Sequence, residues 1–164
     1  MSRVSLAITF LATLFLAGCA EDQFAAQQAV LAQSIAAEQP GDYFIGRRLY
    51  RRNYFFWGYI RKPQQPWSQA QLVMLNEQKT LAPDRAANAI GSDNNIEYRL
   101  KGYFSGQTVY EPASNRFYPE FVLTSYQVIS GNPPRIFRDP NATDVNRLYI
   151  DKPESAGRDE LLRI

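Results

Sequence analysis

Two stretches in the second half of the chain alternate apolar and polar residues, and a period of two is typical of a half-buried strand. In residues 96–104 the apolar side chains and one glycine share a face, while charged residues and one tyrosine occupy the other. Residues 121–129 repeat the alternation, and the segment 111–115 between them is rich in turn-forming residues. Residues 105–106, serine and glycine, predict a bulge. We therefore expect an antiparallel hairpin with an irregular first strand.

The remaining part of the pattern is mostly strand-like. Aromatic residues crowd the stretch 43–59, and such residues favour strands. Residues 70–77 combine helix-favouring residues with a continuous apolar run, and we predict a strand because the neighbouring segments resemble a sheet. The small and polar residues of 80–95 predict a surface loop. Beyond Arg138 the charges are mixed and proline recurs, which predicts a loosely packed tail.

The stretch 21–39 is rich in alanine and glutamine and has a helical period. Phe24, Leu31 and Ile35 fall at i, i+7 and i+11, one narrow apolar stripe, and alanine favours the helix. A proline and a glycine at 40–41 end it. Two interpretations stay open. The helix is either a tether in front of the folded part or an element that packs on its own domain.

The first nineteen residues read MSRVSLAITFLATLFLAGC, with Arg3 followed by an uncharged apolar stretch that ends on small residues. This is the organisation of a secretory signal, and the stretch is shorter than the about 20 residues of a transmembrane helix. The last four residues, Leu16-Ala17-Gly18-Cys19, resemble the lipobox of bacterial lipoproteins. The alternative is an uncleaved signal anchor with an incidental cysteine.

The resemblance implies covalent lipid at Cys19. In this family a diacylglycerol is attached to the sulfur by a thioether, the chain is cleaved before the cysteine, and a fatty acyl group such as palmitate is often added to the new amine. Several acyl chains make such an anchor stable. Alanine rather than aspartate at position 20 implies the outer membrane, facing the periplasm, by the enterobacterial sorting rule. The bilayer is thus an expected partner, and no other cofactor is expected.

The expected organisation has four parts: a lipoprotein signal peptide (1–18), a lipid-anchored helix or tether (19–40), an antiparallel β domain (41–138) and a polar C-terminal tail (139–164). The fold class is mainly β with an N-terminal helix (α+β). Its strands are expected to form a small antiparallel sheet or barrel, with an OB-like barrel as one arrangement.

Composition excludes several kinds of catalysis. The 164 residues contain no histidine and one cysteine, which rules out a Ser-His-Asp triad, a Cys-His pair, a cysteine zinc cluster and an intrachain disulfide. No metal-ligand spacing and no glycine-rich phosphate loop is present, so we expect neither a metal nor an enzyme. Two carboxyl groups among Glu97, Glu111 and Glu120 could serve glycan hydrolysis, but their spacing selects no pair.

The net charge of +2 hides an uneven distribution, because residues 43–76 hold six basic side chains and no acidic one. Arginine is suited to bidentate contacts with phosphate or carboxylate, and aromatic neighbours can stack beside it. The candidate binding surface consists of Arg47, Arg48, Arg51, Arg52, Tyr54, Trp57, Arg61 and Lys62. The alternative is that the aromatic residues are core and the arginines form ion pairs with the acidic remainder. A helix would gather the first four arginines on one side, whereas a strand would divide them between two faces.

These patterns predict a membrane-anchored envelope lipoprotein whose β domain is a non-catalytic binding or structural module. Its candidate partners are anionic lipid, a cell-wall polymer or an envelope protein, and export argues against nucleic acid. A small-ligand-binding barrel lined by aromatic residues is the alternative, and a carboxylate-dependent enzyme acting on cell-wall glycans is a further one.

Overall fold

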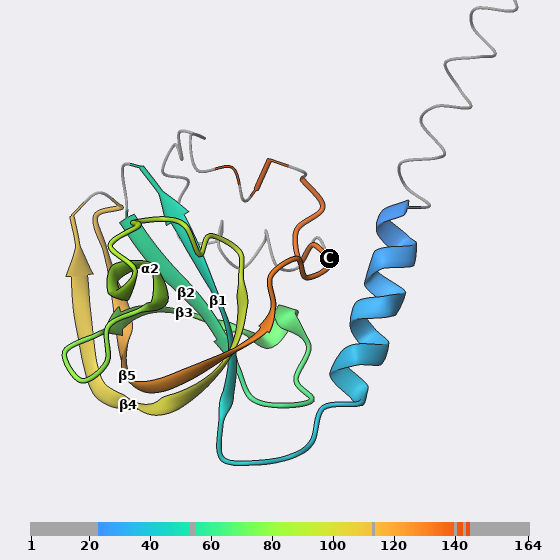
Figure 1. The fold of residues 1–164 in the computed structure, drawn as a ribbon, viewed down its shortest axis with the longest axis horizontal. Helices are drawn as coiled ribbons and strands as arrows, with labels where there is room; N and C mark the ends of the chain where they lie inside the picture. Colours follow the sequence, from blue (N-terminus) through green and yellow to red (C-terminus); the bar gives the residue numbers. More distant parts are fainter. Residues whose placement is uncertain (1–22, 53–54, 113, 140, 143, 145–164) are drawn as a thin grey trace, which may run out of the picture.

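The computed structural model describes residues 23–52, 55–112, 114–139, 141–142 and 144, and of residues 55–57 only the backbone. A helix occupies residues 23–36, and strands make up most of the remainder (Figure 1). The strands are β1 (Phe44–Arg51), β2 (Phe55–Arg61), β3 (Gln71–Asn76), β4 (Glu97–Glu111) and β5 (Arg116–Ser130). The protein is therefore mainly β with an N-terminal helix, and residues 71–76 form the strand expected for them.

The five strands close into a ring in the order β1-β2-β3-β5-β4, with β4 pairing back onto β1. The predicted small β structure is confirmed as strands that close in a ring, although the ring is not a regular barrel and one strand pair departs from the expected antiparallel arrangement. The pair β3–β5 is parallel, with Met74 opposite Glu120 and Asn76 opposite Val122, so the sheet is mixed. A 3₁₀ turn, η1 (Trp67–Gln69), precedes β3, and a one-turn helix, α2 (Pro83–Ala86), lies between β3 and β4.

The inside of the ring is one apolar core. Its buried side chains come from all five strands and are Phe44, Ile60, Val73, Tyr98, Leu100, Phe121 and Leu123. The alternation in residues 96–104 places Tyr98 and Leu100 inside, as predicted. Phe121 makes an edge-to-face contact with Phe44, the ring centroids being 5.0 Å apart. Phe104 also contacts Phe44 and Phe121 edge to face, with ring centroids 5.8 and 5.3 Å apart.

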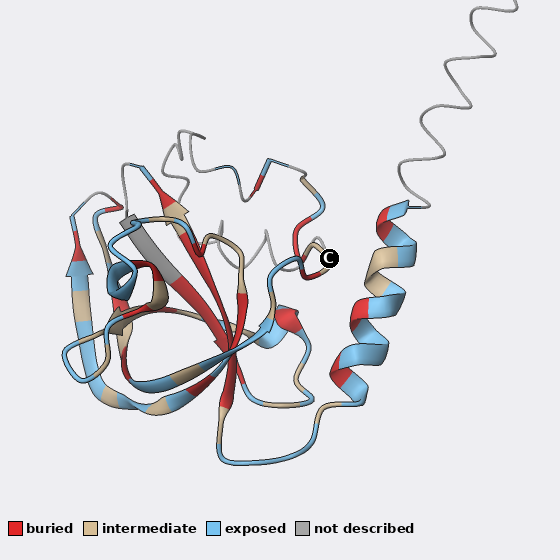
Figure 2. Ribbon diagram, viewed as in Figure 1, coloured by how far each residue is buried: buried red, intermediate tan, exposed pale blue. Residues whose placement is uncertain are grey.

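A second core lies outside the ring, between the outer face of β1 and β2 and the N-terminal helix. It contains Leu31, Ile35, Ile45, Leu49, Tyr59, Trp67, Ile136, Phe137 and Ala142. The buried positions of the helix form one stripe facing the rest of the protein (Figure 2). Gln28 also donates a hydrogen bond of 2.7 Å to the carbonyl of Arg135. Of the two interpretations of the helix, packing on its own domain is the one the structure has.

The predicted hairpin is confirmed, and it is longer and more bent than the sequence indicated. β5 begins at Arg116, and the two strands stay paired to Glu111↔Arg116. The register shifts between Phe104 and Thr108, around Gly106, whose φ is +81°. This is the expected bulge, and glycine suits it because that φ strains other residues. We call residues 108–119 the ribbon tip.

The segment 80–95 is not only a surface loop. It contains α2, and it buries the side chains of Asp84 and Asp93, which are 0% and 2% exposed. The expectation of a purely exposed loop is wrong because both carboxylates bind Arg48 of β1. At the start of the predicted tail, Ala142 is buried in the outer core. Residues 145–164 of that tail lie outside the described residues, as do the signal peptide and Cys19.

Candidate functional site

The basic segment forms β1 and β2, and a strand sends successive arginines to opposite faces. Arg47, Arg48, Arg51 and Arg61 are each no more than 3% exposed. These four side chains therefore cannot form the exposed binding surface that the sequence predicted, because both faces of β1 are covered. Arg47, Arg48 and Arg61 match the alternative in which arginines pair with the acidic remainder, except that these pairs are buried rather than solvated. Arg51 donates to the backbone carbonyl of Asp144 at 2.8 Å.

The other members of the predicted surface do not restore it. Arg52 is exposed at the end of β1. The Lys62 ammonium lies 3.8 Å from the centroid of the Phe44 ring and 3.9 Å from a carboxylate oxygen of Asp42. Tyr54 and the side chain of Trp57 lie outside the described residues.

On the outer face, two guanidiniums lie over the ring of one tryptophan. The guanidinium carbons of Arg47 and Arg61 lie 4.9 and 4.7 Å from the centroid of the Trp67 ring, which is 2% exposed. The two arginines share this face because Ile45 pairs with Arg61 in the β1–β2 register and Arg47 lies two residues further along. Each guanidinium has its own carboxylate: Glu97 lies 2.8 Å from Arg47, and Glu38 accepts a hydrogen bond of 2.7 Å from Arg61.

This stacked group joins three parts of the chain to the ring. Glu38 follows the N-terminal helix, Trp67 belongs to η1, and Pro134 accepts a hydrogen bond of 2.7 Å from Arg47. Burial lowers the pKa of Arg47 and the charge of Arg61 acts in the same direction, against the opposing effect of Glu97. The arrangement stacks and pairs both guanidiniums within the protein, which makes it a structural clamp.

On the inner face, Arg48 meets three carboxylates under the 77–95 segment. Asp84 accepts from one terminal nitrogen at 2.5 Å, Asp93 accepts from the same nitrogen, and Glu77 accepts from the other at 3.1 Å. The Tyr98 hydroxyl donates to Asp93 at 3.3 Å. The cluster joins the connection between β3 and β4 to β1, since all three carboxylates come from that connection.

The two aspartates around Arg48 have opposite pKa shifts. Burial raises the pKa of Asp93 and outweighs the favourable charge of Arg48. For Asp84 burial also acts to raise the pKa, but hydrogen bonds from Arg48 and from the amide of Gly91 outweigh it, and the pKa is lowered. One guanidinium thus holds Asp84 ionised, while Asp93 takes up a proton more readily than a free aspartate.

Asp93→Asn should change how stability depends on pH. The folded-state pKa of Asp93 lies above the unfolded value of about 3.9, so protonated Asp93 favours the folded state at low pH. That contribution to stability is lost as pH rises from the unfolded pKa to the folded pKa, and it does not change at higher pH. The variant has no carboxyl group at position 93 and lacks this loss. Its free energy of unfolding should therefore increase relative to that of the wild type as pH rises from about 3.9. Urea unfolding at a series of pH values measures the difference. Asp42→Asn, the same substitution at an exposed position, is the control for removing one carboxylate. Parallel curves for Asp93→Asn would contradict the prediction.

With the arginines buried, the exposed apolar residues stand out as the available surface, and most lie on β4 and β5. Tyr103 and Tyr110 are each 47% exposed, and Phe117 is 68% exposed. Tyr110 and Phe117 face each other across the ribbon tip with ring centroids 5.2 Å apart. Sequence analysis missed these residues because the alternation assigned Tyr103 to a polar face and Phe117 fell before the predicted second strand. Their aromatic character in a polar setting was the signal that could have identified them.

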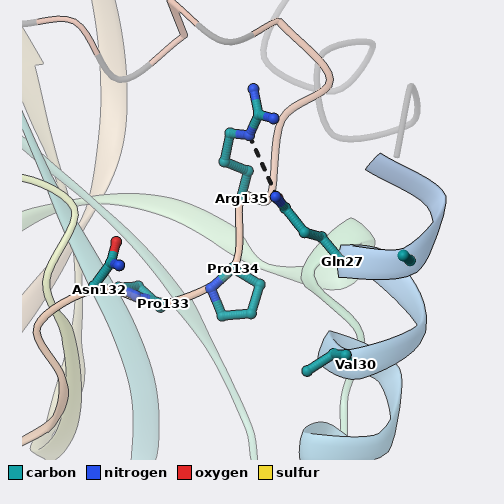
Figure 3. A pocket seen from close by; sticks show the side chains of 7 residues that line it. Gln27, Val30, Asn132, Pro133, Pro134 and Arg135 are labelled. Carbon is teal, nitrogen blue, oxygen red and sulfur yellow. Dashed lines mark hydrogen bonds between the residues drawn. The ribbon is translucent and has the colours of Figure 1, made fainter. Parts of the chain in front are cut away.

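An open groove of about 540 Å³ runs between the N-terminal helix and the segment after β5. Figure 3 shows Val30 and Gln27 of the helix facing Pro133, Pro134 and Arg135, with a hydrogen bond between Arg135 and Gln27. The groove is lined largely by small apolar side chains. It is a seam between two packed segments, and two of its polar side chains, Gln27 and Arg135, are hydrogen-bonded to each other.

The three glutamates considered for catalysis do not come together. Glu97 pairs with Arg47, and Glu111 accepts a hydrogen bond of 2.6 Å from the amide of Ser114 in the hairpin turn. Glu120 accepts a hydrogen bond of 2.8 Å from Asn76. Within the described residues, no group of three or more acidic or cysteine side chains is arranged to hold a metal ion. Each glutamate has a local structural partner instead of a shared cleft.

Comparisons with known proteins add no relative. A scan against protein families finds no match, and neither curated proteins nor solved structures yield one. In the part of the chain that the structure describes, none of the helices combines the length and the apolar character needed to cross a membrane.

Proposed function

We propose that the protein is a membrane-anchored envelope lipoprotein whose β domain is a non-catalytic binding or structural module. The observation that carries the proposal is the placement of the lipobox relative to the folded part. Cys19 lies four residues before Gln23, where the described helix begins, and four residues span at most about 14 Å. The helix itself is packed into the outer core through Leu31 and Ile35. A lipid at Cys19 would hold the domain close to the bilayer.

A non-catalytic role is supported by the use the fold makes of its charges. Arg47, Arg48 and Arg61 have carboxylate partners inside the protein. The aromatic residues that a ligand-binding barrel would use to line a cavity pack on each other, as Phe104 does on Phe121 at 5.3 Å. The separated glutamates, each with its own structural partner, give no support to a glycan-cleaving enzyme.

The partner of such a module would meet the exposed ribbon rather than the arginine segment. At the ribbon tip, Tyr110 and Phe117 offer faces for stacking and apolar contact. An anionic lipid surface, a cell-wall polymer and an envelope protein remain the partner classes, because a domain anchored at Cys19 would meet these first.

Cys19→Ala should abolish lipid attachment. Cells fed a radioactive fatty acid should label the wild-type protein and leave this variant unlabelled, because the acyl chains require the cysteine for attachment and processing. Membrane fractions then report the position of the labelled protein. Ala20→Asp is the matched control, since it keeps the cysteine. It should take up label and, under the enterobacterial sorting rule, move to the inner-membrane fraction. Label on Cys19→Ala would refute the proposal.

A further inference from the structure

We propose that the ribbon tip makes a second contact with the bilayer to which Cys19 is attached, so that the domain lies against the membrane in one orientation. This inference rests on the proposed lipid anchor and deepens it. It assigns an interaction surface to Tyr110 and Phe117, and it commits to a phospholipid surface as their partner.

The first support is where the chain enters the domain. The described helix begins at Gln23, four residues after Cys19, so the bilayer surface lies within about 14 Å of this end of the helix. In Figure 1 the N-terminal end of the helix lies at the upper right and the ends of β4 and β5 that meet in the hairpin lie at the upper left, so both reach the upper part of the view, with the end of β1 between them. A membrane along that upper part would therefore meet the ribbon tip as well as the helix.

The second support is the chemistry of the tip. Phe117 is 68% exposed, and its ring lies against Tyr110, whose hydroxyl donates a hydrogen bond of 2.9 Å to Asn115. A phenyl ring beside a tyrosine with a polar end is the combination that favours the boundary between headgroups and acyl chains. Two exposed aromatic rings at the end of a hairpin can enter that boundary without moving the rest of the fold.

The third support is positive charge beside the start of the helix. Arg138 is exposed, and its guanidinium lies 5.8 Å from the centroid of the Phe24 ring. Arg135 lies next to Gln27 (Figure 3). Both arginines belong to the segment that packs along the helix, so they would approach the headgroups together with the anchor. Basic side chains near an anionic surface strengthen such a contact.

The bend in β4 separates a matched pair of tyrosines. Tyr103 and Tyr110 lie on the same strand and have the same exposed fraction, 47%. Tyr103 precedes the bulge and pairs with Val122, whereas Tyr110 follows the bulge and pairs with Phe117 in the ribbon tip. A membrane contact at the tip should therefore leave the neighbourhood of Tyr103 in water, which supplies an internal control.

A dye attached at the tip can test this contact in the full-length lipidated protein. Phe117→Cys and Tyr103→Cys are each labelled with an NBD maleimide and placed in vesicles of phosphatidylethanolamine and phosphatidylglycerol that contain doxyl-labelled lipid. The dye at position 117 should lose most of its emission to the quencher in the acyl chains, and the dye at position 103 should keep its emission. The wild type is treated with the same dye and should remain unlabelled, because its one cysteine is held in the thioether.

The outcomes separate the two proposals. Dye uptake by the wild type shows a free thiol and overturns the lipid anchor, and the second contact falls with it. An unlabelled wild type with unquenched emission at position 117 overturns the second contact alone. Equal quenching at positions 117 and 103 also overturns it, since the domain would then have no preferred orientation. A dye at 117 that responds only to added cell-wall glycan overturns it in favour of a polymer partner.

Discussion

Arg48→Met should destabilise the protein by about 3–5 kcal/mol at neutral pH, the usual cost of removing one partner from a buried ion pair. Methionine fills similar space, so the loss is chiefly electrostatic. The substitution leaves Asp84 and Asp93 buried without their shared guanidinium, while Glu77 keeps Arg85 at 3.1 Å. Carboxylates in that position should take up protons, and the deficit relative to the wild type should shrink as pH falls toward 4. Urea unfolding at neutral and acid pH measures both effects.

The control for this prediction is Arg52→Met, which removes the same charge from the end of the same strand. Arg52 is exposed, and its substitution should change the unfolding free energy by no more than about 0.5 kcal/mol. If Arg48→Met lowers the free energy of unfolding by the same amount at every pH, the loss comes from packing rather than from charge. A fully stable Arg48→Met would mean that the 77–95 segment does not depend on this cluster.

Gly102→Ala should cost about 3 kcal/mol, because a Cβ at this position would lie 2.2 Å from the carbonyl oxygen of Val122 and 2.6 Å from the Phe121 ring. The nearest obstacle is the backbone of the paired strand, so a rotamer change cannot relieve the clash. Thermal unfolding should show a melting temperature lower by more than about 10 °C. Gly131→Ala is the control, since nothing lies within 4 Å of a Cβ there. An unchanged melting temperature for Gly102→Ala would contradict the close approach of β4 and β5.

The ring and its strands were largely predictable because the relevant signals are local. Alternation identified the paired halves of β4 and β5, and the glycine at 106 marked the bulge. The parallel pair β3–β5 was not predictable in this way. β5 pairs with β3, which is also paired with β2. No residue in 71–76 specifies on its own that β5 is the second partner or that it runs parallel.

The burial of the arginines could not be predicted from the local sequence, because their ion-pair partners lie far along the chain. Arg48 binds carboxylates that lie 29, 36 and 45 residues further along, and Arg47 binds Glu97, 50 residues further along. A window over 43–76 contains only the basic half of these pairs. The signal that was available is the acidic remainder of the chain, since an acid-free segment in a nearly neutral protein must find its counter-charges elsewhere. The exposed aromatic rings of the ribbon tip were not predicted either. Whether an aromatic side chain is exposed depends on whether a distant part of the chain packs against it, and the local sequence does not show this.

The hydrogen bond between Gln28 and the carbonyl of Arg135 joins residues 107 positions apart, and it sets an order of events during synthesis. The outer core needs Ile136 and Phe137 as well as Leu31, so it cannot form before nearly all of the described chain has been made. The ring is under the same constraint, because β5 must be present before β3 and β4 are joined. Folds with such distant contacts assemble slowly. A nascent chain of this kind stays open until late, which suits a protein that, on the lipoprotein proposal, has to cross a membrane before it folds.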